Sequence, residues 1–135
     1  MKMKSLDKPA DYYGLSLILG GAESSLWDVT KSYASAASTL NYFISHSSTY
    51  RSNEFAEPSY LREQETDFGE EQFDAPIFGV GAIYHMFKSL KEVNRPEGGE
   101  NWQFFDSSQP IAWKTGTSFG FKDAWAVGVT PKYAI

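Results

Sequence analysis

The chain of 135 residues has no cysteine and only two histidines. The lack of cysteine excludes a thiol nucleophile, a disulfide framework and a cysteine-ligated zinc site. His46 and His85 show no paired ligand spacing, and His85 is expected to be an ordinary residue of a helix rather than a metal ligand or general base. The sequence therefore predicts no metal and no other cofactor.

Positive charge and long apolar runs are also scarce. The 12 Lys and Arg residues against 17 Asp and Glu residues give a net charge of −5, which argues against nucleic acid as the main partner. Apolar stretches such as 15–19 are too short to cross a bilayer, and no signal-peptide core follows the basic start. With 41% hydrophobic and 21% charged residues, we expect a soluble globular chain of single-domain size without a membrane segment.

Apolar residues at helical spacing predict two helices. The first begins after Ser25, an N-cap that forms a capping-box-like pair with Asp28. The second is expected from Asp74 to about Val93, with Pro76 in its first turn and Lys88 and Lys91 near its negative end. The apolar stripe of the first comprises Leu26, Val29, Tyr33, Ala37 and Leu40, and that of the second Ile77, Val80, Ile83, Tyr84, Phe87 and Leu90.

Other segments lack a helical period. Residues 1–22 are predicted to be extended or irregular, with a turn at Gly20-Gly21, and residues 41–74 to form a surface loop with one short strand at most. Residues 94–99 are predicted to form a turn. Acidic residues in the loop have irregular spacing that favours a solvated segment over a cation site: Glu63, Glu65, Asp67, Glu70 and Glu71.

Two strands are predicted near the end, Ile111–Thr117 and Ala124–Val129, joined by a connection of hairpin length. Tyr133–Ile135 would start a third strand that stops after three residues, which suggests a truncated domain. We therefore expect an α/β (α+β) fold over residues 1–135 as one partial domain. In it an antiparallel sheet, with Lys114 on its central strand, packs against helices.

The run Lys114-Thr115-Gly116-Thr117-Ser118 carries the chemistry of the first of these strands, which we expect to be buried. The lysine supplies positive charge for an anionic group, and the hydroxyls supply directed donors. Gly116 leaves space for a ligand against the backbone, and a free strand edge can pair with an extended peptide. This pattern favours a site that binds a carboxylate.

Lys-Thr-Gly is also one of three signature elements of the penicillin-binding proteins and class A β-lactamases, beside Ser-x-x-Lys and Ser-x-Asn. Three longer stretches, 110–131, 13–23 and 95–102, resemble the transpeptidase domain of class A penicillin-binding proteins of type 1C. The resemblance covers most of the chain and is least clear over 44–72. It implies the C-terminal part of a serine transpeptidase domain with a β-lactamase-like fold.

The resemblance implies a parent protein on the periplasmic face of the bacterial inner membrane, with a membrane anchor and a glycosyltransferase domain. A serine of such proteins attacks the D-Ala-D-Ala carbonyl of a peptidoglycan stem peptide, and an amine of a second stem accepts the acyl group. β-Lactams trap the same serine. By this resemblance Lys114, Thr115, Gly116, Thr117 and Ser118 would bind the substrate, and the Thr117 backbone N–H would form half of the oxyanion hole.

No catalytic residue is predicted in this chain, and the nucleophilic serine is expected upstream. Ser5-Leu6-Asp7-Lys8 matches the letters of Ser-x-x-Lys, but Pro9 disfavours helical geometry at Lys8. No Ser-x-Asn occurs, and Thr39-Leu40-Asn41 is explained better by helix packing. Four aromatic residues could line a groove, although core packing is the stronger interpretation: Trp102, Phe104, Phe105 and Trp113.

Two hypotheses follow from these residues. The first is a transpeptidase fragment that is inactive alone. The alternative is a non-catalytic, stand-alone module that binds peptide stems or a protein partner through its strand edge.

Overall fold

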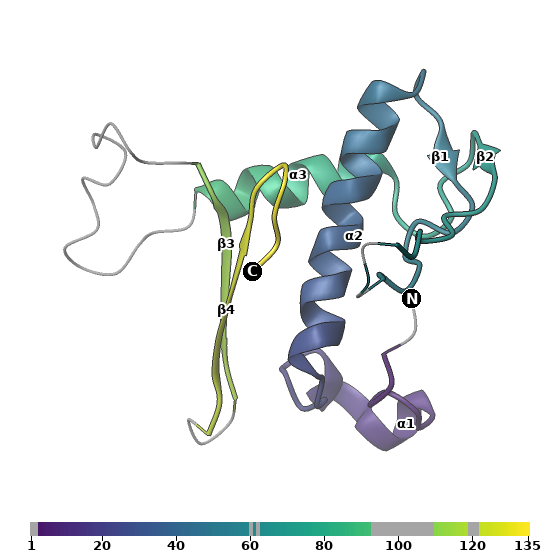
Figure 1. The fold of residues 1–135 in the computed structure, drawn as a ribbon. Helices are drawn as coiled ribbons and strands as arrows, with labels where there is room; N and C mark the ends of the chain where they lie inside the picture. Colours follow the sequence, from purple (N-terminus) through teal and green to yellow (C-terminus); the bar gives the residue numbers. More distant parts are fainter. Residues whose placement is uncertain (1–2, 60, 62, 93–109, 119–121) are drawn as a thin grey trace.

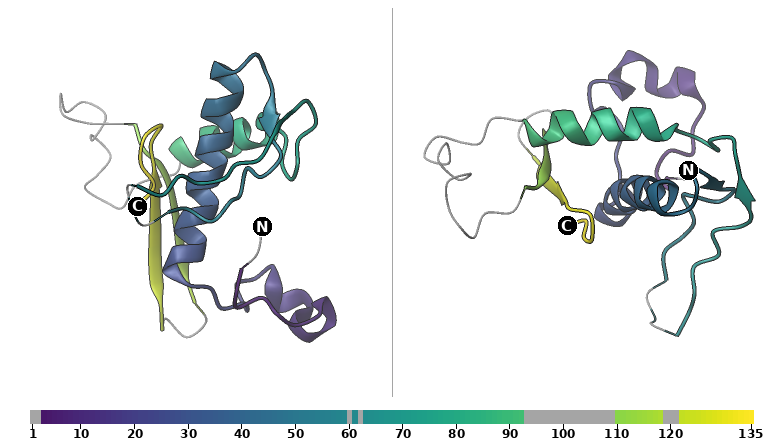
Figure 2. Two further views of the ribbon diagram at one scale, coloured as in Figure 1. Left: turned by 45° about the vertical axis from the view of Figure 1, so that its right-hand side comes forward. Right: turned by 90° about the horizontal axis from the view of Figure 1, so that it is seen from above.

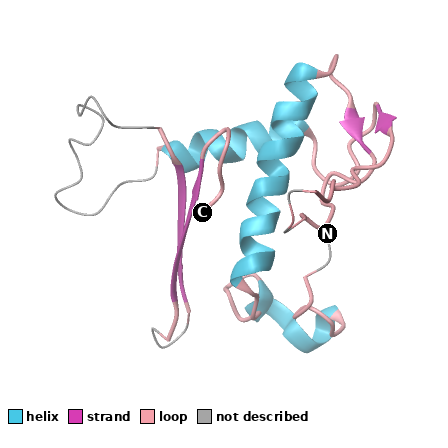
Figure 3. Ribbon diagram, in the orientation of Figure 1, coloured by secondary structure: helices cyan, strands magenta, loops and turns pink. Residues whose placement is uncertain are grey.

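The computed structural model describes residues 3–59, 61, 63–92, 110–118 and 122–135. The strands in these ranges form two separate antiparallel pairs, β1–β2 and β3–β4. Figures 1 and 3 show a mixed fold of helices and small antiparallel sheets, which confirms the fold class predicted from the sequence. The elements are α1 (Ala10–Tyr13), the 3-10 helix η1 (Gly14–Leu17), α2 (Leu26–Ser45), β1 (Tyr50–Arg51), β2 (Glu71–Gln72), α3 (Val80–Lys91), β3 (Ala112–Thr117) and β4 (Ala124–Val129).

Helix α2 lies between the β3–β4 hairpin and the β1–β2 pair, both in the view of Figure 1 and from above in Figure 2. Its predicted start is confirmed, because the backbone N–H of Asp28 donates to Ser25 Oγ at 3.0 Å, and Ser25 Oγ donates to Asp28 Oδ2 at 2.9 Å. These bonds satisfy one of the free N–H groups of the first turn. The helix continues to Ser45, beyond the predicted apolar stripe.

Helix α3 begins later than predicted. Its N-cap is Gly79, so Asp74 and Pro76 precede the helix instead of forming its first turn, and Ile77 is exposed. The N–H of Val80 donates to the hydroxyl of Tyr50 at 3.0 Å. A side chain distant in the sequence therefore satisfies the first N–H of α3, which local capping signals could not reveal. Lys88 and Lys91 lie in the last turn, as predicted.

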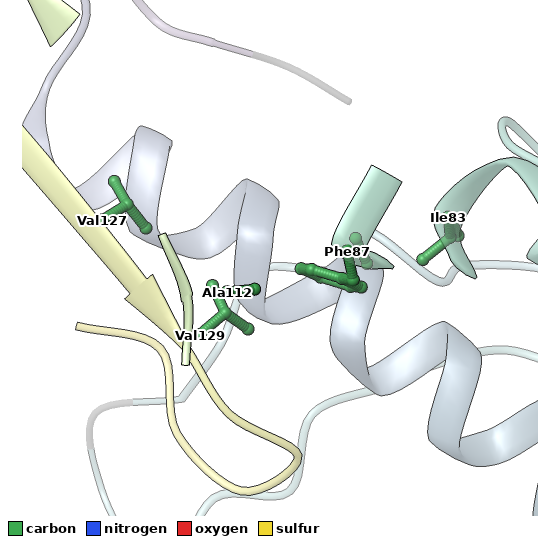
Figure 4. Close-up of a cluster of buried hydrophobic side chains, with 6 residues drawn as sticks. Ile83, Phe87, Ala112, Val127 and Val129 are labelled. Carbon is green, nitrogen blue, oxygen red and sulfur yellow. The ribbon is translucent and has the colours of Figure 1, made fainter. Parts of the chain in front are cut away.

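The hydrophobic core lies where α2 and α3 meet the β3–β4 hairpin. Its buried members come from all four elements and are Ala36, Ile83, Phe87, Ala112, Val127 and Val129 (Figure 4). The α2 residues Val29, Tyr33, Ala37 and Leu40 pack against this cluster, which confirms that part of the predicted stripe. Leu26 and Tyr84 belong to the predicted apolar stripes, but both are more than half exposed, so the stripes do not extend to them.

The segments predicted to be irregular contain short elements. Residues 1–22 include α1 and η1, and Gly20 has φ of 88°, which confirms the turn there. The predicted loop 41–74 contains the end of α2 and the β1–β2 pair, in which Tyr50 faces Gln72. The predicted turn 94–99, the aromatic residues Trp102, Phe104 and Phe105, and residues 119–121 of the predicted hairpin connection lie outside the described residues.

The C-terminal residues extend the β3–β4 sheet beside β4. Ala134 forms a bridge with Val129, and Gly128 and Ile135 exchange two backbone hydrogen bonds of 3.0 and 2.9 Å. In the part of the chain that the structure describes, β4 is thus the middle strand and β3 is an edge strand. The prediction that Lys114 lies on a central strand was wrong, because only β4 pairs with β3 there.

Candidate functional site

Strand β3 carries the Lys-Thr-Gly run along a gradient of burial. Ala112 is buried and Trp113 half-buried, whereas residues 114–117 are exposed, so the strand is not buried throughout as predicted. Lys114 is opposite Val127, and Gly116 is opposite Trp125. Since paired residues share a face, Lys114 and Gly116 lie on the face that packs on the helices, and Thr115 and Thr117 lie on the other.

The pairing of β3 also fixes the direction of its backbone groups. The N–H of Ser118 donates to the carbonyl of Asp123 at 3.0 Å, so this pair is hydrogen-bonded. Hydrogen-bonded and open pairs alternate along an antiparallel ladder. The N–H groups of Thr115 and Thr117 therefore point away from β4, toward the outer edge of β3.

A cleft of about 630 Å³ separates the end of the β3–β4 hairpin from the segment that precedes α2. Gly116, Thr117 and Ser118 line one wall and residues 20–24 the other. The two stretches 13–23 and 110–131, which the sequence analysis singled out, thus face each other across this cleft. Lys114 and Thr115 do not line it, and Lys114 Nζ donates to the carbonyl of Thr115.

The wall formed by residues 20–24 is held by local contacts. The N–H of Gly21 donates to the carbonyl of Ser16 at 2.6 Å, and a Cβ on Gly21 would lie 2.6 Å from the Ser16 Cβ. Ser5 Oγ donates to the carbonyl of Glu23, also at 2.6 Å. The hydrogen bond from Ser5 therefore fixes the backbone of this wall at Glu23.

The Ser5-to-Lys8 run has no shared helical face, because α1 begins only at Ala10. Lys8 Nζ contacts Asp7 Oδ2 at 3.2 Å. This geometry agrees with the sequence argument from Pro9.

The remaining sequence candidates have structural roles. Thr39 is buried inside α2, where its hydroxyl donates to the carbonyl of Ser35 and to Glu54 Oε2, and Asn41 Nδ2 donates to the carbonyl of Pro131 at 2.7 Å. His46 caps the end of α2 and stacks on Tyr42, and His85 is exposed on α3. Trp113 lies 3.8 Å from the position of a Cβ on Gly128.

Within the described ranges, no three His, Asp or Glu residues are arranged to hold a metal ion. The acidic residues of the loop at 63–71, which were predicted to be solvated, show no such grouping. No helix in those ranges is long and apolar enough to cross a membrane.

Buried charges on α2 were missed by the sequence analysis. Lys31 Nζ contacts Glu57 Oε2 at 2.7 Å and Asp28 Oδ1 at 3.5 Å. The hydrogen bond to Glu57 raises the pKa of Lys31 and lowers the pKa of Glu57, and the hydrogen bond from Ser25 lowers the pKa of Asp28. These contacts fix the loop at residue 57 to the first turns of α2.

A second buried ion pair secures the loop after β1. The carboxylate of Glu54 is fully buried and accepts from Arg51 Nη2 at 2.8 Å and from the N–H of Arg51 at 2.9 Å. The Arg51 guanidinium also lies between the rings of Tyr42 and Phe68, at 4.4 and 3.7 Å from their centroids. Polar residues recurring at 28, 31, 35 and 39 were the sequence signal for this buried side of α2.

A curated relative aligns with most of the chain. Penicillin-binding protein 1C of Escherichia coli (strain K12) is 32% identical over 125 residues, which are 90% of this chain and 13% of that protein. The chain therefore spans about an eighth of the length of this relative, and the resemblance predicted from the residues is confirmed. No protein-family model matches the chain, and no solved structure matches it significantly.

Proposed function

We propose that this chain, which is similar to part of penicillin-binding protein 1C, forms the substrate-binding part of a peptidoglycan D,D-transpeptidase domain. The observation that supports this most is the cleft between Gly116, Thr117 and Ser118 on β3 and the residues that precede α2. Its volume of about 630 Å³ lies in the range typical of pockets for small ligands.

The proposed roles of the side chains on β3 rest on the resemblance to the relative, and only that of the Thr117 N–H also rests on its orientation. Lys114 provides positive potential for the C-terminal carboxylate of a D-Ala-D-Ala stem peptide, and the Thr115 and Thr117 hydroxyls donate to that carboxylate. The N–H of Thr117, directed to the open edge of β3, is suited to donate to the oxyanion of a tetrahedral intermediate. Gly116 allows the ligand to approach the strand, and Ser118 contributes a hydroxyl at the end of the cleft.

The whole protein would act in cell-wall cross-linking. In this proposal a class A parent with a glycosyltransferase domain is anchored in the bacterial inner membrane. It exposes the transpeptidase to the periplasm, where stem peptides and β-lactams reach it. The nucleophilic serine is supplied from outside this chain. The 135-residue chain is then a partial domain without catalytic activity of its own.

Calorimetric titration of the chain with a peptide that ends in D-Ala-D-Ala tests this proposal. Lys114→Ala is expected to weaken binding about tenfold, since a hydrogen bond to a charged group contributes about 1.5 kcal/mol or more. Lys132→Ala is the matched control, because Lys132 is an exposed lysine that does not line the cleft. An equal loss in both variants, or no binding at all, would contradict the proposed site.

Intact-mass measurement after exposure to benzylpenicillin tests the missing nucleophile. We expect the mass of the chain to remain unchanged. A mass increase equal to one penicillin would show that a serine of this chain reacts.

The open edge of β3 supports a second candidate function. In the described part of the chain β3 pairs with β4 alone, so the N–H groups of Thr115 and Thr117 are positioned to bond an added strand. A stand-alone module could bind peptide stems or a protein partner in this way. Such a module would retain peptide binding in Lys114→Ala and would lose it when the backbone of the edge is blocked by Thr115→Pro.

A further inference from the structure

A second pocket, of about 390 Å³, lies between the C-terminal half of α2 and the turn that follows β4. Figure 1 shows this turn in yellow beside α2. The amide of Asn41 holds the two walls together, because its Nδ2 donates to the carbonyl of Pro131 at 2.7 Å. The pocket is separate from the cleft beside β3, since the two have no lining residue in common.

The charged side chains that line this pocket are all basic. Arg51, Lys132 and His46 line it, and no Asp or Glu does. The pocket therefore concentrates basic groups in a chain whose net charge is −5. The ammonium of Lys132 is exposed and has no ionic or hydrogen-bond partner among the described residues, so it can bind a ligand without first losing another contact.

The guanidinium of Arg51 is held in a stack of planar groups. It lies between the rings of Phe68 and Tyr42, and the imidazole of His46 stacks on Tyr42 with 3.9 Å between the ring centroids. Because the rings cover its faces, Arg51 offers hydrogen-bond donors only at its edge. The stack thus fixes the plane of these donors before any ligand arrives.

Part of that edge remains open. The bonds of Arg51 to Glu54 and Ser38 use Nε and Nη2, and Nη1 takes part in none of the side-chain bonds of the described structure. The Glu54 carboxylate is fully buried and does not line the pocket, although its charge offsets that of Arg51. Arg51 therefore supplies directed donors to the pocket, and Lys132 supplies the net positive charge.

The end of α2 is prepared so that it repels an anion less. Free carbonyl groups at the C-terminal end of a helix carry partial negative charge. Here Ser45 Oγ donates to the carbonyl of Asn41 at 2.8 Å, and the N–H of His46 donates to that of Tyr42 at 2.9 Å. These bonds satisfy carbonyl groups that border the pocket.

We propose that this pocket binds the phosphate group of a small ligand, with Lys132 and Arg51 as its main partners. A phosphate dianion has several acceptor oxygens and can accept from an ammonium and from a guanidinium edge at once. A stem peptide with its single carboxylate has less charge and fewer acceptors for the same groups. The inference does not rest on the proposed function, because the pocket and the cleft are separate.

Amide chemical shifts during titration with sodium phosphate at pH 8, where phosphate is a dianion, test the inference. We expect the signals of residues 42–46 and 130–134 to move to saturation and those of residues 116–118 to stay in place. Sodium chloride at equal ionic strength is the control for screening and should not reproduce the movement. Glycerol 2-phosphate distinguishes two sources of the group: tighter binding than phosphate indicates an ester, and equal binding indicates free phosphate.

Lys132→Gln should weaken phosphate binding about fivefold, the upper end of the range for an exposed charge pair. Lys88→Gln is the matched control, because Lys88 is an exposed lysine of α3 outside the pocket. Ala34→Leu retains every charge and fills part of the pocket, so it should also weaken binding. Circular dichroism melts show whether each variant keeps the fold.

The outcomes keep the two proposals apart. Equal movement in chloride and phosphate, or unchanged affinity in Lys132→Gln, would overturn the phosphate site and leave the proposed function standing. Phosphate should not displace a peptide that ends in D-Ala-D-Ala. Displacement of that peptide, with movement at residues 116–118 in place of residues 130–134, would show that phosphate occupies the cleft and would overturn the second pocket as its site.

Discussion

Two lysines of this chain lie in opposite environments. Lys31 on α2 has a side chain that is only 6% exposed and contacts the carboxylates of both Asp28 and Glu57. Lys114 on β3 is exposed and bonds only to the carbonyl of Thr115 in the described structure. Burial without a partner would be costly for either charge, so the buried lysine is paired, while the exposed one can remain available for a ligand.

This difference in burial and pairing distinguishes charged residues that stabilise the fold from those to which we assign ligand binding. Lys31 on α2 contacts Glu57, and Arg51 and Glu54 bond to Ser38 and Thr39 of α2, so these charged residues hold the loop of residues 49–57 against the helix. Lys114 is exposed and has no ionic partner among the described residues. Substitutions in the first group should lower stability, and substitutions in the second should lower ligand binding.

Removal of Glu54 should have the largest effect. Glu54→Ala leaves the half-buried Arg51 guanidinium without its carboxylate and should lower the free energy of unfolding by about 3–5 kcal/mol, as is typical when one partner of a buried ion pair is removed. Urea denaturation followed by circular dichroism measures this loss. Glu63→Ala, on the exposed loop, is the control and should change it by less than about 0.5 kcal/mol. Equal stability of the two variants would refute the structural role of Glu54.

Acidification should weaken the Lys31 cluster. The folded-state pKa values of Asp28 and Glu57 are lowered, so their contribution to stability is present above the unfolded value of about 4 and is lost as the pH falls through the folded-state pKa. Melting temperatures between pH 6 and pH 2.5 should therefore fall. Lys31→Met should flatten this dependence by removing the main cause of the Glu57 shift, whereas parallel curves for both proteins would contradict the pairing.

Loss of the α2 cap should have a smaller effect. Ser25→Ala removes the acceptor of the Asp28 N–H and the donor to Asp28 Oδ2, and it should cost about 1 kcal/mol. Thermal melts compare it with Ser25→Asp, which retains a capping oxygen and should recover much of the loss. If alanine and aspartate gave the same melting temperature, the cap would have no energetic role.

Substitution of Lys114 should have the smallest effect on stability. Lys114→Ala removes an exposed side chain and should change the free energy of unfolding by less than about 0.5 kcal/mol, even though it weakens the proposed peptide binding. Urea denaturation of Lys114→Ala and of Lys31→Ala compares the stability of the two variants. Lys31→Ala should be clearly the less stable. If Lys114→Ala lowered the free energy of unfolding as much as Lys31→Ala, the two lysines would not differ in their contribution to stability.

The sequence predicted the elements whose signals are local. The Ser25 and Asp28 pair marked the start of α2, and alternating residues with a short connection marked β3 and β4. The chain resembled its relative in the two stretches that meet at the cleft. These features depend on neighbouring residues and on motif identity, which a sequence displays directly.

Features that depend on distant contacts escaped prediction. The first N–H of α3 donates to the hydroxyl of Tyr50, 30 residues earlier, whereas the nearby Asp74 precedes the helix. The two-residue strands β1 and β2 are too short to show a period. The buried polar side of α2 is formed by contacts with Glu54 and Glu57, which lie in the loop after β1. The cleft likewise depends on segments distant in the sequence, residues 20–24 and 116–118.

Amide chemical shifts during titration with a D-Ala-D-Ala peptide would test the central claim most directly. We expect the shifts to move at residues 20–24 and 116–118, on the two walls of the cleft, while residues 130–134, which follow β4, remain unchanged. Binding that moved the signals of residues 130–134 and left Thr117 and Ser118 unaffected would show that the Lys-Thr-Gly strand is not the ligand site.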